Sequence, residues 1–271
     1  MYESYWKLES APFSYRPTGS GLYRSHSHQA SSLRLRYCFA NNAGAAMLLG
    51  NSGVGKSSLL QQLRAEEQEL RPFAHIAFPT LAPTELLRAV VVEVTGDESL
   101  NQLPTDGMLL KLGRFLEKNS AEGRHAVIAF DEAHLLPNDS LNQVVLPLLN
   151  FADTHRRLSF SVVLCGQPVL ASYVARNAQL RERIAVKATL ESFTAKETTD
   201  YIQSRMLAAG AEREVFREDA IRAIIDLSGG NPRRINRLCD MALLVGYADQ
   251  IESITAREVE GLEAEFLPAA A

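Results

Sequence analysis

The chain has 271 residues, of which 46% are hydrophobic and 22% are charged, and its formal net charge at pH 7 is −4. This composition is typical of a folded globular protein, which excludes the disordered, collagen-like and disulfide-scaffold classes. The slightly negative charge excludes binding to nucleic acid or to an anionic membrane through the overall field of the protein. Any such contact has to be a local patch.

The three cysteines, Cys38, Cys165 and Cys239, are widely spaced and lie in apolar stretches. An odd number in such surroundings predicts small buried residues in a reducing compartment. The polar start lacks the basic and apolar regions of a signal peptide, and no stretch approaches about 18 consecutive apolar residues. We therefore expect a cytoplasmic location and no transmembrane segment.

Apolar runs and helical patterns alternate through the first two thirds of the chain. Residues 1–25 are rich in Tyr, Ser, Pro and Gly, which predicts an irregular lead-in. Short apolar runs typical of strands occur at residues 45–49, 73–78, 126–130, 159–164 and 186–190. Helices are expected over 27–40, 56–70, 84–94 with Thr84 as N-cap, 106–119 and 141–151. This alternation predicts a parallel sheet flanked by helices, with a ligand at the carboxyl ends of the strands.

The strand pattern disappears after residue 192. Thr194 and Glu197 form a capping box that begins a helix ending near Gly210, and further helices are expected over about 217–227, 232–247 and 255–266. The predicted domains are a lead-in segment packed on the core (1–43), an α/β domain (44–192) and a small all-helical lid (193–267).

A glycine-rich loop joins the first predicted strand to a helix. Residues 50–57 read GNSGVGKS and fit the P-loop pattern, in which backbone N–H groups and a helix N-terminus hold phosphate oxygens. Lys56 is expected to reach the β and γ phosphates and Ser57 to ligate Mg²⁺. The predicted nucleotide-binding residues of this loop are Gly50, Asn51, Ser52, Gly53, Val54, Gly55, Lys56, Ser57 and Ser58.

Two carboxylates follow the predicted strand at 126–130. Asp131 is placed to hold the Mg²⁺ through water, and Glu132 to polarise the attacking water. Residues 131–134 also spell DEAH, a helicase-type box, but helicases of that class need two such sheet domains in tandem and this chain has one P-loop. His134 is interpreted as a local hydrogen-bonding residue. The histidines and cysteines do not cluster at ligand spacing, so no zinc site is expected.

Two arginine positions and one glutamine are further candidates. Gly229 and Gly230 end one helix and Pro232 begins the next, which aims Arg233 from the lid toward a γ-phosphate; a solvated basic helix face is the alternative. Arg181 and Arg183, just before the last strand, are candidates for a finger that reaches a neighbouring subunit's site; an ordinary surface run is the alternative. Gln167, after the fourth strand, is a candidate for orienting the attacking water.

With these residues the chain resembles the AAA+ ATPases, and within them the secretion-pathway A-type (ExeA-like or GspA-like) group. The resemblance implies the finger role for Arg183, the lid-sensor role for Arg233 and a place near the first sensor for Gln167. It implies ATP and Mg²⁺ as cofactors and a nucleotide-dependent homo-oligomer. Beyond the P-loop it rests on residues 5–8, 12–14, 22–23, 131–134, 166–168, 181–184, 197, 201–202, 205–206, 209–210 and 230–234.

Two functions stay open. In the first, the protein is an ATPase that works on protein partners of a secretion, pilus or export system, peripheral to the inner membrane through a partner. In the second, ATP drives assembly on DNA, as in the similar transposition-helper ATPases. The negative net charge favours the first. Arginines that could line a DNA-binding face are Arg156, Arg157, Arg176, Arg181, Arg233, Arg234 and Arg237.

Overall fold

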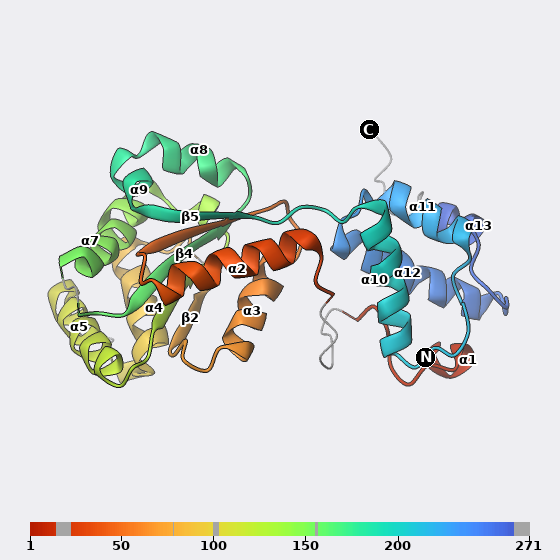
Figure 1. Cartoon of the computed structure of the whole chain (residues 1–271), viewed down its shortest axis with the longest axis horizontal. Coiled ribbons are helices and arrows are strands. Elements are labelled where there is room, and N and C mark those ends of the chain that lie inside the picture. The colour runs from red at the N-terminus through yellow and green to blue at the C-terminus, as the bar shows by residue number, and fades with distance from the viewer. Residues whose placement is uncertain (15–22, 78, 100–102, 155–156, 263–271) are drawn as a thin grey trace. The chain divides into compact units, whose positions relative to one another are not determined.

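The computed structural model describes residues 1–271 except 15–22, 78, 100–102, 155–156 and 263–271, so the expectations for Leu22, Phe78, Arg156 and the end of the last helix lie outside the described residues. The chain forms two compact units. One is His26–Leu190, and the other combines Met1–Ser25 with Glu191–Ala271 (Figure 1).

A five-stranded parallel sheet forms the centre of the unit His26–Leu190, in the order β2-β3-β4-β1-β5. All residues of β1, β3 and β4 are buried, because these strands are covered on both faces and therefore have continuous apolar sequences. Strand β5 lies at an edge and alternates between buried and exposed residues over most of its length. The strands are β1 (Ala45–Leu49), β2 (Phe73–Ile76), β3 (Ala126–Phe130), β4 (Phe160–Gly166) and β5 (Ile184–Thr189).

Two hydrophobic cores lie on opposite faces of this sheet. Val127 and Ala129 of β3 belong to one core, and Ile128 and Phe130 belong to the other, as the two-residue period of a strand requires. A π-helical segment, Leu141–Val145, precedes α7. The helices of this unit are α2 (His26–Ala40), α3 (Lys56–Glu66), α4 (Pro83–Thr95), α5 (Thr105–Ala121), α6 (Asn138–Ser140), α7 (Leu146–Thr154), α8 (Val169–Arg176) and α9 (Ala178–Arg183).

The second unit is helical and includes the start of the chain. Trp6 is buried in its core and donates from Nε1 to the carbonyl oxygen of Leu243 at 2.9 Å. Arg205 donates from Nε to the carbonyl oxygen of Pro12 at 2.6 Å. The helices of this unit are α1 (Glu3–Trp6), α10 (Ala195–Ala208), α11 (Glu218–Ser228), α12 (Pro232–Ala248) and α13 (Ala256–Gly261).

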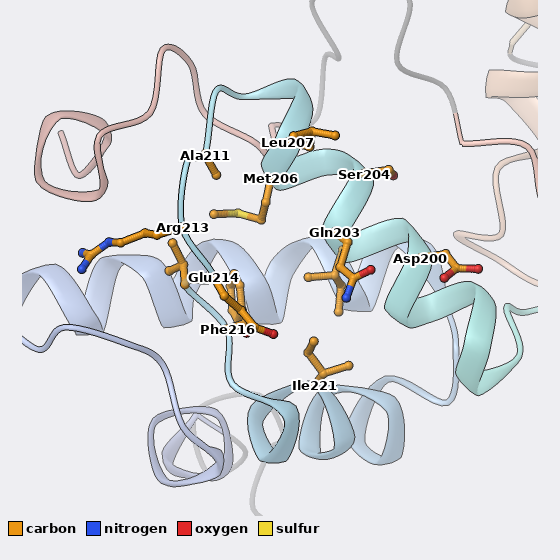
Figure 2. Close-up of a pocket in the computed structure, with 12 residues that line it drawn as sticks. Asp200, Gln203, Ser204, Met206, Leu207, Ala211, Arg213, Glu214, Phe216 and Ile221 are labelled. Atoms are coloured by element: carbon orange, nitrogen blue, oxygen red, sulfur yellow. The ribbon is translucent and has the colours of Figure 1, made fainter.

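A pocket of about 510 Å³ lies in this helical unit, between α10 and the connection that leads to α11 (Figure 2). Met206, Phe216 and Ile221 are among its buried apolar lining residues. Arg213 points away from it, with its guanidinium carbon 5.7 Å from the centre of the Trp6 ring. The pocket is not lined by any of the predicted nucleotide-site residues.

The predicted fold class is confirmed, and the structure changes several details. Thr84 is not an N-cap, because α4 begins at Pro83 with Ala82 before it. Helices α1, α8 and α9 were not expected, and the helix predicted at 141–151 begins as the π-helical segment. The lead-in was expected as one segment, 1–43, on the sheet core; the structure groups Met1–Ser25 with the helical unit, because Trp6 and other lead-in side chains are buried there.

The three cysteines are buried and free, as expected. Among the described residues, no helix is long and apolar enough to cross a membrane.

Candidate functional site

The P-loop follows the carboxyl end of β1, and glycine is required at several of its positions. Gly53 and Gly55 have φ values of 83° and 101°, which L side chains rarely adopt. A Cβ on Gly50 would lie 2.7 Å from Val54 Cγ2, and one on Gly55 would lie 3.0 Å from Nε2 of the buried His28. The loop backbone therefore packs too closely for side chains at these positions.

Lys56 begins helix α3 and is almost fully buried, with 5% of its surface exposed. Its Nζ donates to the carbonyl oxygens of Gly50 at 3.0 Å and Asn51 at 3.1 Å. No side chain caps the N-terminus of α3, so its first N–H groups are oriented for an anion. A cationic side chain and a helix N-terminus thus converge on one loop, as phosphate binding requires.

Ser57 and Asp131 join the P-loop to the end of β3. Ser57 Oγ donates to Asp131 Oδ2 at 2.6 Å, although strand β4 lies between β1 and β3 in the sheet. His75 Nε2 lies 3.2 Å from the same oxygen, and the N–H of Glu132 donates to Asp131 Oδ1 at 2.9 Å. Burial opposes ionisation of Asp131, but the hydrogen bonds from His75, Ser57 and the Glu132 backbone outweigh it and lower the pKa of this carboxyl below its ordinary value.

These donors fit a magnesium ion. A serine hydroxyl and an ionised carboxylate are hard oxygen ligands, and Mg²⁺ is commonly held by one or two carboxylates together with waters and substrate phosphates. Burial and the negative charge of Asp131 raise the pKa of the Cys165 thiol, so a neutral thiol lies beside that carboxylate. In the described part of the chain, no cluster of three or more His, Cys, Asp and Glu residues is suited to hold a metal.

Glu132 and Gln167 follow the carboxyl ends of β3 and β4. Glu132 has a φ of 48°, which is uncommon for a residue other than glycine. Residues in such conformations cluster at functional sites. The side chain of Glu132 is 41% exposed, and its Oε2 lies 3.4 Å from Nδ1 of His134. The N–H of Gln167 donates to the same Nδ1 at 3.4 Å. The ends of β1, β3 and β4 therefore bring the P-loop, the two carboxylates and the Gln167 backbone to one edge of the sheet.

Arg183 lies at the opposite edge of the sheet, where the parallel strands begin. It is the last residue of α9, directly before β5, which runs parallel to β1. Its guanidinium donates to the carbonyl oxygen of Gln179 at 2.9 Å and to Asn150 Oδ1 at 2.5 Å. The structure therefore does not bring Arg183 together with the P-loop of its own unit.

Arg233 belongs to the helical unit, in the first turn of α12. Asn231 caps this helix by accepting from the backbone N–H groups of Arg233 at 3.1 Å and Arg234 at 3.4 Å. The glycine pair before it has positive φ values of 56° and 70°. The local turn is the one predicted, and the sensor role of Arg233 stays a prediction.

Comparison with known proteins identifies the family. Residues 40–174 match the AAA domain family. Over 98% of its length the chain is 33% identical to General secretion pathway protein A of Aeromonas hydrophila, and the match covers 50% of that protein. The chain contains an AAA domain and is GspA-like. The GspA-like chain spans half the length of this relative.

Solved structures share the fold of the GspA-like chain. Cdc6p from Pyrobaculum aerophilum matches with a TM-score of 0.77 at 18% identity, over 96% of this chain and 72% of that one. ORC2 from Aeropyrum pernix, solved as ADPNP–ADP complexes, matches at 0.68 and 18%, over 95% and 72%. ORC1 from the same organism, in complex with DNA, matches at 0.64 and 20%, over 89% and 66%. At these identities the likeness shows the fold alone.

Two residues at the site were missed by sequence reasoning. His75 contacts Asp131 from β2, and His28 packs against Gly55 from α2. The available signal for His75 was a polar residue inside a short apolar strand, but its partner lies 56 residues away. No local pattern connects positions so far apart.

Proposed function

We propose that this GspA-like chain is an ATP hydrolase that uses Mg-ATP to drive assembly or remodelling of a partner complex in a secretion, pilus or export system at the inner membrane. The observation that carries the proposal is the hydrogen bond between Ser57 Oγ and Asp131 Oδ2, 2.6 Å long and spanning 74 positions of the sequence. It unites the predicted phosphate loop with the predicted carboxylates. The AAA domain match and the GspA relative support the same function.

Each residue then has a chemical task. Lys56 exchanges the carbonyl oxygens of Gly50 and Asn51 for the β and γ phosphates. Ser57 and Asp131 would hold Mg²⁺, whose positive charge stabilises the negative charge that develops on the phosphoryl oxygens. Glu132 polarises the attacking water, and a carboxylate that is partly exposed has access to one.

Two further residues complete the proposed site. Gln167 orients the attacking water from the end of β4, and Arg233 responds to the γ-phosphate as the lid sensor. Both roles come from the resemblance of residues 166–168 and 230–234 to the family pattern.

Arg183 acts in the site of a neighbouring copy in this proposal. It precedes β5, whereas the P-loop follows β1, and these strands are parallel and paired. The arginine and the P-loop of one unit are therefore at opposite edges of the sheet, where they cannot meet. A finger supplied by a neighbour raises the rate by about 10³–10⁵ in related phosphoryl-transfer enzymes. The active form is then a nucleotide-dependent homo-oligomer.

The deciding experiment is Mg²⁺-dependent ATPase activity measured against protein concentration for the wild type, Arg183→Ala and the control Arg181→Ala. Specific activity should rise with protein concentration in the wild type and in the control. In Arg183→Ala it should be lower than in the wild type by a factor of about 10³ or more. Specific activity that is flat with concentration contradicts the role of Arg183 in a neighbour's site. ATP binding without turnover under any condition contradicts the hydrolase proposal.

ATP-dependent assembly on DNA is the second candidate, favoured by the likeness to ORC1, which was solved in complex with DNA. Basic residues at Arg157, Arg176, Arg181, Arg234 and Arg237 would carry the phosphate contacts. A shift of duplex DNA that requires ATP and weakens with salt would support this function. Absence of binding at low salt would contradict it and leave the protein-partner function.

A further inference from the structure

The ring of His134 is shared by two groups of the site. Its side chain is 10% exposed, and it lies in the short 3-10 helix Ala133–Leu135 that follows Glu132. Nδ1 lies 3.4 Å from Oε2 of Glu132 and 3.4 Å from the backbone nitrogen of Gln167, whose N–H points at it. One ring nitrogen therefore faces both the proposed water-activating carboxylate and the end of β4.

This nitrogen cannot serve both groups at once. In a neutral imidazole Nδ1 either has a lone pair, which accepts from the N–H of Gln167, or carries the proton, which it donates to the carboxylate of Glu132. In the first arrangement the ring proton is on Nε2, and in the second it is on Nδ1. The net charge of the ring is the same in both, and the proton exchanges through water.

Close packing holds the ring at this position. A Cβ on Gly166 would lie 3.2 Å from both the backbone nitrogen and Nδ1 of His134, so the glycine at the end of β4 makes room for the ring. The same glycine accepts a hydrogen bond from the N–H of Gly50, at 3.1 Å. Gly50 in turn accepts from Lys56 Nζ at 3.0 Å. A continuous set of contacts thus runs from the phosphate-binding lysine to His134 and Glu132.

We propose that His134 is a positioning residue that couples occupancy of the P-loop to Glu132, a regulation of the site that rests on the proposed function. While Lys56 is bonded to the carbonyl of Gly50, Nδ1 accepts from the N–H of Gln167. When Lys56 leaves that carbonyl for phosphate, the end of β4 shifts and the ring takes the arrangement in which Nδ1 donates to Glu132. The Glu132 carboxylate is then held in position to polarise water.

The ring proton can be located directly. Nitrogen-15 spectra of ring-labelled protein, assigned with His134→Asn, are recorded without nucleotide and with a non-hydrolysable ATP analogue. The ring proton should be on Nε2 without nucleotide and move to Nδ1 with the analogue, while amide exchange at Gln167 becomes faster. An unchanged tautomer in the nucleotide-bound protein overturns the proposal. This readout does not depend on turnover, so it stays separate from a failure of the hydrolase activity.

Variants separate positioning from structure. His134→Phe keeps a ring and removes both hydrogen bonds, and it should lower kcat by about tenfold or more without changing KM or ATP affinity. His134→Asn, which keeps a polar atom near the Nδ1 position, should restore most of that loss, and it decides the question if the Phe variant does not fold. His125→Asn, a second buried histidine of the same unit, is the control and should retain full turnover.

A double variant tests whether His134 acts through Glu132. In a Glu132→Gln background, His134→Phe should cause no further loss of turnover. An equal loss in that background, or a loss of ATP affinity in either His134 variant, would show that the histidine does not act through Glu132.

Discussion

Because the strands are parallel, the sheet has an amino edge, where the strands begin, and a carboxyl edge, where they end. A buried polar cluster lies at each end of β3, one at the amino edge and one at the carboxyl edge. Before β3, the ring nitrogens of His125 lie 2.8 Å from Ser159 Oγ and 3.0 Å from Ser161 Oγ. After β3, Asp131 is held by Ser57 and His75. The second edge also has positive-φ glycines and a helix N-terminus without a side-chain cap. A buried polar cluster thus marks a site only where its groups can exchange their partners for a ligand.

The two clusters also treat charge in opposite ways. Burial lowers the pKa of His125 to about 4, so this histidine is neutral at pH 7. Asp131 is buried as well, yet its hydrogen bonds keep its pKa below the ordinary value and its carboxylate charged. The cluster around His125 is neutral and the cluster around Asp131 is charged, as expected of a structural cluster and of the proposed cation site.

Among the changes at the carboxyl edge, Glu132→Gln should have the largest effect on turnover. Turnover should fall by about 10²–10⁴, because the amide cannot act as a base, while ATP binding is retained. Single-turnover hydrolysis and fluorescent-nucleotide binding measure the two quantities. Glu122→Gln, before the same strand at the amino edge, is the control and should be silent. Equal loss of binding and turnover in Glu132→Gln would contradict its role.

Lys56→Ala should weaken ATP binding by about ten- to a hundredfold, since a hydrogen bond to a charged group contributes about 1.5–3 kcal/mol. Titration with a fluorescent ATP analogue measures this. Lys187→Ala, on the exposed side of edge strand β5, removes the same charge and should bind normally. Unaltered binding in Lys56→Ala would remove the P-loop from the proposed site.

Gly166→Ala should reduce turnover several-fold and stability by about 1 kcal/mol. The added Cβ meets the His134 ring and Leu170 at 3.1–3.2 Å, so those neighbours have to move. Gly107→Ala, where the nearest atom is at an ordinary 3.5 Å, is the matched control. Urea denaturation and steady-state kinetics separate the two effects, and a Gly166→Ala protein with normal kcat would show that the ring has room to spare.

Acid should lower the stability of the fold through the cluster around His125, at the amino edge, independently of catalysis. Between pH 6.5 and about 4 the unfolded chain binds a proton at His125 that the folded chain does not, so stability falls as pH falls, by about 3 kcal/mol across that window. Urea denaturation at fixed pH values should show this slope in the wild type and not in His125→Asn. Protonation of Asp131 lowers the stability further only below the ordinary pKa of this carboxyl, near 3.8. An unchanged slope in His125→Asn would assign it to other groups.

Sequence reasoning located the strands at the carboxyl edge because strands buried on both faces have continuous apolar sequences bounded by polar residues. Residues 45–49 and 126–130 were predicted with the observed bounds, and both motifs follow them directly. Helices α8 and α9 were missed because eight and six residues are too few for a clear helical period. Arg183 was named without its placement at the amino edge.

Contacts between distant segments could not be predicted in the same way. The bond from His75 to Asp131 depends on the pairing of β2 with β3, which no local pattern gives. The grouping of Met1–Ser25 with the helical unit depends on which core receives Trp6. Both are properties of the assembled fold.

The burial of Trp6 beside Leu243 has a consequence for how the protein is made. Their hydrogen bond spans 237 positions, so at about 5–20 residues per second the ribosome needs roughly 10–50 s between the two. During that time His26–Leu190 can leave the exit tunnel and fold, while Tyr2, Trp6 and Phe13 lack the helices that bury them. These three side chains are thus among the last to be buried, and they stay exposed on the nascent chain until α12 emerges.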